Sequence, residues 1–183
     1  MKTRRLVINA SLLTLLIVST FIKIPVFLVP FTLQLLVVII ISLTTNTADS
    51  LIIFLTYIIM GLIGIPIFAS GGGISYLYNP SFGFILGFII VAVVVNVLRN
   101  SLSKVISNSF WVFLISSIIG LICLYIFGFS YALVLFNHVL GKNYSLINIL
   151  EIMVFPFILV DLLKCVLASY IVIKLKNIGS NIE

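Results

Sequence analysis

The chain has 183 residues, of which 63% are hydrophobic and 8% are charged, whereas about a quarter of the residues of an ordinary soluble domain are charged. A soluble protein of this length could not bury so much apolar surface, so the composition excludes that class and predicts an integral membrane protein. Since a membrane-spanning helix needs about 20 apolar residues, one domain of this length has room for about six. The net charge of +6 comes from scattered lysines and arginines without a basic stripe, which argues against nucleic acid as a partner.

Six apolar runs predict membrane-spanning helices that form a compact all-α bundle. They cover about residues 6–24, 31–45, 50–69, 82–98, 109–135 and 156–175. Two prolines mark the segment IPVFLVP, between the first two runs, as a turn or a re-entrant stretch. The apolar region 146–175 is too long for one span, and proline is tolerated in a first helical turn, so we expect the sixth span to start near Pro156. Residues 146–154 are then expected to form a short helix at the outer mouth of the bundle.

The lysines and arginines outside the spans indicate how the bundle is oriented. With six spans and both termini inside, two basic residues, Lys23 and Lys142, fall on the outer side. The inner set is Lys2, Arg4, Arg5, Arg99, Lys104, Lys174 and Lys176. This excess follows the positive-inside rule and predicts that the N- and C-termini are cytoplasmic.

Two ionisable residues, Asp161 and Lys164, interrupt the last apolar run, FPFILVDLLKCVLASY. A charge at a helix centre costs about 2.5–3.5 kcal/mol on insertion scales, so the pair predicts a polar site that faces the interior of the bundle. Their spacing of three residues places them on one helix face, about one turn apart. A ligand that enters from outside would meet them one to two turns below the surface. The alternative is a self-neutralising pair, or a lysine that extends to the membrane interface.

The loop SGGGISYLYNPSFGF is the most glycine-rich part of the chain and a second candidate for ligand contacts. Adjacent glycines let the backbone approach a ligand closely. Stacking surfaces and hydrogen-bonding groups are added by Tyr76, Tyr78, Asn79, Ser81 and Phe82. A plain flexible loop is the alternative. Gln34 lies early in the second run, where its amide needs a partner and could serve either helix packing or a ligand.

The other polar residues give little support for catalysis. His138 and Trp111 are expected at the membrane interfaces, and Asp49 and Glu151 are expected in solvent near loops. The sequence contains no phosphate-binding G-x-x-x-x-G-K-[ST] pattern, no nucleophile–base set and no His/Cys metal spacing. It therefore predicts no enzymatic activity, no bound metal and no cofactor, and it disfavours an intramembrane enzyme.

Four stretches resemble the BioY family, the biotin-binding substrate-capture (S) components of energy-coupling factor (ECF) transporters. They are PFTLQLL at 30–36, GLIGIPIFASGGG at 61–73, NPSFGFILGF at 79–88 and PFILVDLLK at 156–164. The resemblance implies a six-helix bundle in a prokaryotic plasma membrane, with an outward-facing biotin pocket closed by loops that include the one between the first two spans. It also implies three partners, a membrane-embedded coupling subunit and two cytoplasmic ATPases.

The resemblance also implies roles for individual residues. The polar ligand contacts fall on Asp161 and Lys164. Looser candidates for ligand contact are Gln34, Asn79, Gly71, Gly72 and Gly73. Asp161 could accept hydrogen bonds from the ureido N–H groups of biotin, and Lys164 could pair with either the ureido oxygen or the tail carboxylate.

Small residues in the first helix of an S component pack against the coupling subunit, and the resemblance places this role on Ala10 and Thr14. Thr14 departs from the usual alanine, although small residues of either kind permit close approach of two helices.

Two further departures concern the loops. TTNTADS stands where a Gly-Pro pair is usual, and GGGISYLYNPSFGF carries aromatic residues where glycine or alanine is common. These changes alter the shape of the pocket, so an S component for another small vitamin is an alternative. A self-contained small-molecule carrier is a second alternative, from a different class.

Overall fold

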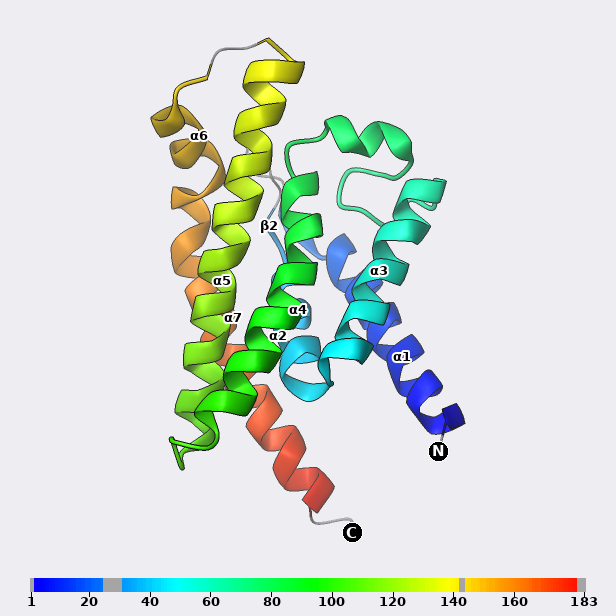
Figure 1. Cartoon of the computed structure of the whole chain (residues 1–183). Helices are drawn as coiled ribbons and strands as arrows, with labels where there is room; N and C mark the ends of the chain where they lie inside the picture. Colours follow the sequence, from blue (N-terminus) through cyan, green and yellow to red (C-terminus); the bar gives the residue numbers. More distant parts are fainter. Residues whose placement is uncertain (1, 25–30, 142–143, 181–183) are drawn as a thin grey trace.

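The computed structural model describes residues 2–24, 31–141 and 144–180 as a bundle of helices with both chain ends at one end (Figure 1). The described residues contain seven α-helices, a 3-10 helix (η1), a π-helical turn (η2) and a two-stranded ribbon. In chain order the elements are α1 (Lys2–Phe21), β1 (Lys23–Ile24), β2 (Phe31–Thr32), α2 (Gln34–Thr44), α3 (Thr47–Ile63), η1 (Ile74–Tyr78), α4 (Phe82–Leu102), α5 (Ser109–Val134), η2 (Leu135–Val139), α6 (Leu146–Met153) and α7 (Phe155–Ser180).

Four of these helices, α1, α4, α5 and α7, are long and apolar enough to cross a membrane, which confirms the predicted class of helical membrane protein. The expected count of six membrane-spanning helices needs correction, because α2 has 11 residues and α3 has 17. At a rise of 1.5 Å per residue they extend about 16 and 26 Å, less than the roughly 30 Å of a hydrocarbon core. The described bundle therefore combines two short helices with four long ones.

Local structure explains why both short helices differ from the expected runs. The run 31–45 begins with Phe31 and Thr32, which pair antiparallel with Ile24 and Lys23, so α2 starts only at Gln34. The run 50–69 is interrupted at Gly64, whose left-handed conformation (φ 116°) ends α3 at Ile63. The expected turn or re-entrant stretch at IPVFLVP, which was also the expected pocket-closing loop, falls mainly on residues 25–30, outside the described residues.

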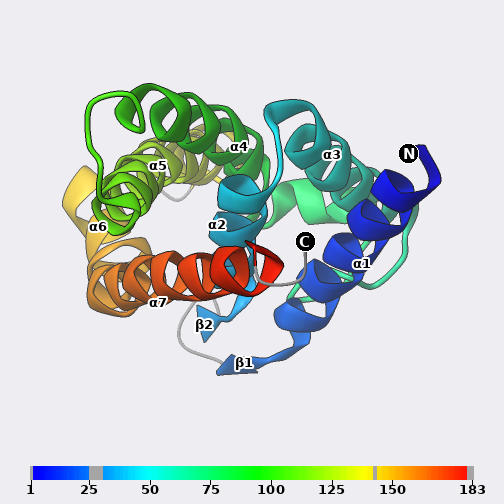
Figure 2. The same cartoon turned by 90° about the horizontal axis from the view of Figure 1, so that it is seen from below.

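The helix α2 lies at the centre of the bundle, between α7, α4 and α1 in the end-on view of Figure 2. Nine of its eleven residues are buried. The helices α4 and α5 form an antiparallel hairpin with close contact at glycines. A Cβ atom added at Gly87 would lie 2.6 Å from Cδ1 of Leu124, and one at Gly83 would lie 2.4 Å from Cβ of Tyr131. The spacing of these two glycines on α4 is the G-x-x-x-G pattern that permits close helix packing in membranes.

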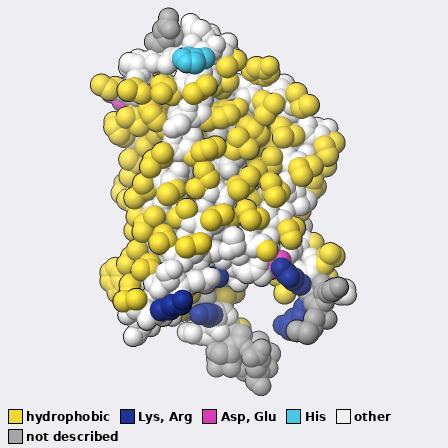
Figure 3. All heavy atoms as spheres, viewed as in Figure 1, with side chains coloured by type: hydrophobic (Ala, Val, Ile, Leu, Met, Phe, Trp, Pro, Cys, Tyr) yellow, Lys and Arg dark blue, Asp and Glu magenta, His cyan; other side chains and the backbone are white. Residues whose placement is uncertain are grey.

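The Lys and Arg side chains visible in Figure 3 gather at the end of the bundle that holds both termini, below a broad hydrophobic band. Asp49, which was expected in solvent, is buried at this end and accepts hydrogen bonds from three residues. Arg5 Nε lies 2.7 and 2.9 Å from its two oxygens, Asn9 Nδ2 lies 2.7 Å away and Asn46 Nδ2 lies 2.8 Å away. The expectation for Asp49 was wrong, because Arg5 and Asn9 come from α1, 40 or more residues away in the chain.

Candidate functional site

A cavity of about 80 Å³ lies between the N-terminal parts of α2, α4 and α7. It is enclosed by β2, α2, α4, α5 and α7, by Met153 of α6, and by the loop and 3-10 helix between α3 and α4. The polar residues in its wall are Thr32, Gln34, Tyr76, Ser81, Tyr125, Asp161 and Lys164. A largely apolar wall with a few converging polar groups is typical of a small-molecule site.

Asp161 and Lys164 both line the cavity, in agreement with the predicted polar site facing the interior of the bundle. The helix α7 starts at Phe155 with Pro156 in its first turn, which places Asp161 about 9 Å along the helix axis. Both residues are buried, with 6% and 7% of their surface exposed. Lys164 Nζ donates to Asp161 Oδ1 at 2.7 Å, so the two side chains pair along one face of α7.

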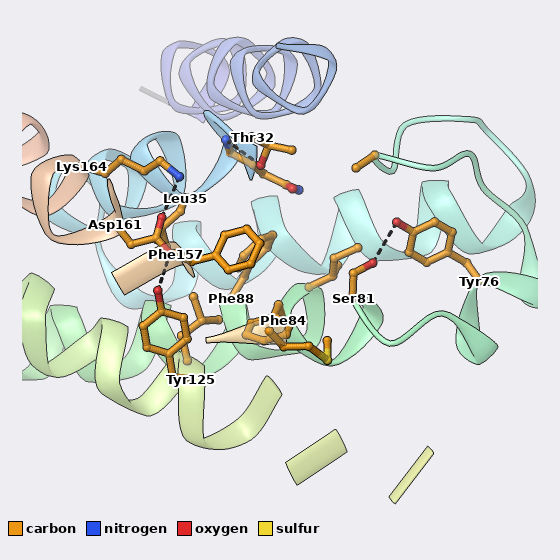
Figure 4. Close-up of a pocket in the computed structure, with 15 residues that line it drawn as sticks. Thr32, Leu35, Tyr76, Ser81, Phe84, Phe88, Tyr125, Phe157, Asp161 and Lys164 are labelled. Atoms are coloured by element: carbon orange, nitrogen blue, oxygen red, sulfur yellow. Dashed lines mark hydrogen bonds and ion pairs between the residues drawn. The ribbon is translucent and has the colours of Figure 1, made fainter. Parts of the chain in front are cut away.

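A third residue, Tyr125 of α5, completes this group. Its hydroxyl donates to the second oxygen of Asp161, Oδ2, at 2.6 Å (Figure 4). The carboxylate is therefore held from two sides, by a cation on its own helix and by a phenol on a neighbouring helix. Sequence reasoning missed Tyr125. The available signal was a phenolic hydroxyl within a long apolar run, where such a group needs a hydrogen-bond partner.

A second polar group lies at the other end of the cavity, with the rings of Phe84, Phe88 and Phe157 between the two groups (Figure 4). It consists of Tyr76 and Ser81, whose hydroxyl oxygens are 3.2 Å apart. Both are among the residues of the glycine-rich loop that were expected to add stacking surfaces and hydrogen-bonding groups, although neither was named as a ligand contact. The cavity thus has one charged end, one hydroxyl end and an aromatic middle.

Gln34 also lines the cavity, at the first turn of α2. Its amide nitrogen donates to the hydroxyl of Tyr57 on α3 at 2.8 Å, and only 6% of the residue is exposed. Both roles left open for Gln34, helix packing and lining of a ligand space, are therefore compatible with its position.

The structure does not bring Asn79 or Tyr78 to the cavity wall. Asn79 Oδ1 accepts from the backbone N–H and the hydroxyl of Ser81, at 2.9 and 2.7 Å, so it supports a residue that does line the cavity. Tyr78 is 61% exposed.

The three glycines Gly71, Gly72 and Gly73 shape the loop and are likewise not part of the wall. Gly71 and Gly73 have φ values of 121° and 96°, and a Cβ atom at Gly72 would lie 2.3 Å from the carbonyl oxygen of Ile65. Their direct contact with a ligand stays a prediction.

Ala10 and Thr14 lie on an exposed face of α1, away from the cavity. Thr14 Oγ1 donates to the carbonyl oxygen of Ala10 at 2.9 Å, which keeps the hydroxyl on its own helix. The hydroxyl proton of Thr14 is therefore used within α1.

A model of the BioY family matches residues 1–181. The chain belongs to the BioY family. It is 38% identical over 135 residues to a probable biotin transporter BioY of Lysinibacillus sphaericus, covering 74% of this chain and 67% of the relative. It is 33% identical over 126 residues to the biotin transporter BioY of Thermotoga maritima, covering 68% and 72%.

The fold agrees with this BioY assignment. The structure matches the S-component for biotin from an ECF-type ABC transporter with a TM-score of 0.79, over 96% of this chain and 92% of that one. At 23% sequence identity this match establishes the fold of a transporter S component. Because the chain belongs to the BioY family and has helices long enough to span a membrane, it is a multi-pass protein of the prokaryotic plasma membrane.

Proposed function

We propose that this BioY-family protein captures biotin from the outer face of the membrane for ATP-dependent uptake by partner subunits. The observation that carries the proposal is the buried Asp161–Lys164 pair at the wall of a cavity in a chain of this family. A buried ion pair in a membrane protein is costly unless it serves a site, and here it faces a space that a ligand can occupy.

The two ends of the cavity match the two polar ends of biotin. The ureido ring presents two N–H donors and one carbonyl acceptor, which complement the carboxylate of Asp161 and the ammonium group of Lys164. The Ser81 hydroxyl donates to Asn79 Oδ1 and the Tyr76 hydroxyl lies 3.2 Å from Ser81 Oγ, so these two hydroxyls would become donors for the tail carboxylate only by exchanging their present hydrogen bonds. The phenylalanine rings would cover the apolar thiophane ring. In this arrangement Lys164 pairs with the ureido oxygen.

Biotin binding requires rearrangement of the cavity. Ligand sites commonly measure about 300–1,000 Å³, whereas this cavity measures about 80 Å³. Each oxygen of Asp161 already accepts one hydrogen bond, so a ureido N–H must replace Tyr125 or Lys164 or share an oxygen with one of them. The ammonium group of Lys23, in β1, donates to the carbonyl oxygen of Ala69 at the cavity wall, so opening on this side would also separate β1 from the loop that holds Ala69.

Transport needs energy from other proteins, and the proposed partners are a coupling membrane subunit and two ATPases. The exposed face of α1 around Ala10 and Thr14 would pack against the coupling subunit. Both termini and the Lys/Arg-rich end would then face the cytoplasm, and the cavity would face outward.

A thermal-shift measurement on the purified protein tests the substrate. Biotin at 100 times its dissociation constant should add about 2.7 kcal/mol to the free energy of unfolding. Other vitamins at the same concentration should add much less. Equal stabilisation by another vitamin would favour the alternative S component, and biotin uptake by cells that lack the ATPases would favour a self-contained carrier.

A further inference from the structure

Tyr57 of α3 lies outside the cavity and is completely buried, with its hydroxyl at the centre of a group of polar atoms from four segments. The hydroxyl lies 2.9 Å from the backbone oxygen of Ile67, 2.8 Å from Nε2 of Gln34 and 3.2 Å from Oγ1 of Thr20. Of these residues, Gln34 alone lines the cavity. The group therefore connects one wall residue to buried atoms behind it.

The chemistry of these atoms fixes the direction of each hydrogen bond. A backbone carbonyl oxygen can only accept, so Tyr57 must use its single proton to donate to Ile67. The phenol oxygen is then left as an acceptor, and Gln34 must present its NH₂ group rather than its carbonyl oxygen. Rotating the Gln34 amide by half a turn would place two acceptors against each other.

The orientation of the Gln34 amide determines what the cavity can recognise. No residue of the described part of the chain donates a hydrogen bond to Oε1 of Gln34, and this oxygen is not among the fully buried atoms without a partner, so it is accessible at the cavity that Gln34 lines. An accessible amide oxygen has free lone pairs, and a hydrogen-bond donor on a ligand can use them.

We infer that Tyr57 is a positioning residue that holds Gln34 with its carbonyl oxygen available to accept from an N–H or O–H group of the ligand. The inference rests on the proposed function, under which that donor is an N–H group of the biotin ureido ring. Gln34 thereby adds a neutral acceptor to the charged acceptor Asp161, and ligands without such donors are disfavoured at this wall.

A double-mutant cycle with biotin titration tests this role. Q34L should weaken biotin binding by about tenfold, since a ligand donor then loses its acceptor. Y57F should weaken binding by about fivefold in the unmodified protein and by less than about twofold in the Q34L background, because it acts through Gln34. The matched control T20V removes a different hydroxyl from the same buried group and should change the affinity by less than about twofold.

The outcomes separate this inference from the proposed function. Equal losses from Y57F in both backgrounds, or a loss from T20V as large as that from Y57F, would overturn the inference and assign Tyr57 to packing alone. Melting curves without ligand show that each variant is folded, and Y57W or Y57H replaces Y57F if it is not. An unmodified protein that does not bind biotin would overturn the proposed function and this inference with it.

Discussion

Replacing Asp161 by asparagine removes the negative charge that pairs with Lys164 inside the bundle. Lys164 Nζ lies 2.7 Å from Asp161 Oδ1, and both side chains are more than nine-tenths buried. Among the described residues no other carboxylate forms an ion pair with Lys164. Removing one partner of a buried pair costs about 3–5 kcal/mol because it leaves an uncompensated charge. We therefore expect D161N to lower the free energy of unfolding by about 3 kcal/mol and to weaken biotin binding more than tenfold.

A second substitution separates the two effects of D161N. In D161N/K164M both charges are absent, and replacing a whole buried pair by uncharged groups is often neutral for stability. The double variant should regain most of the lost thermal stability but should still not bind biotin. The matched control D49N alters the other ion-paired aspartate, at the opposite end of the bundle, and should leave biotin affinity within about twofold.

Thermal unfolding and biotin titration of the four purified proteins provide the assay. An unchanged affinity in D161N would remove Asp161 from the binding site. Full recovery of biotin binding in D161N/K164M would show that charge neutrality matters and that neither side chain recognises the ligand.

Three further substitutions test other parts of the account. G87L should lower the thermal midpoint, because even a Cβ atom at this position would lie 2.6 Å from Leu124. Overpacking of this kind costs about 1–3 kcal/mol, and an unchanged midpoint in a melting curve would contradict the close α4–α5 packing. Y78A should change biotin affinity by less than about twofold in a titration, since Tyr78 is 61% exposed and outside the cavity wall; a tenfold loss would place it in the bound-state site. A10L should leave biotin binding intact but reduce co-purification with the coupling subunit, because a bulky side chain on the exposed face of α1 prevents close approach of a partner helix. Unchanged co-purification would show that the coupling subunit docks on another surface.

The long helices were predictable because lipid requires continuous apolar length, and the break before α7 was predictable because proline disfavours a helix interior. The short helices were not. The late start of α2 depends on the pairing of Phe31 and Thr32 with an earlier segment, and the end of α3 depends on the left-handed conformation of Gly64. The sequence alone does not show whether a glycine in an apolar run ends a helix or allows close packing in the middle of one.

The candidate site was predictable where burial is costly. Asp161 and Lys164 stood out because charge in a span needs a reason, whereas Tyr125 resembled the many tyrosines of membrane proteins. Asn79 shows the limit of motif reasoning, because a short motif does not distinguish a residue that faces a cavity from one that supports its neighbour. Asn79 bonds to Ser81, and Ser81 is the one at the wall.

A structure of this protein with biotin bound would test the central claim most directly. The account predicts biotin between the Asp161–Lys164 pair and the Tyr76–Ser81 hydroxyls, with a ureido N–H on the Asp161 carboxylate and the cavity enlarged. Biotin bound elsewhere, with the hydrogen bonds of Tyr125 and Lys164 to Asp161 unchanged, would contradict it.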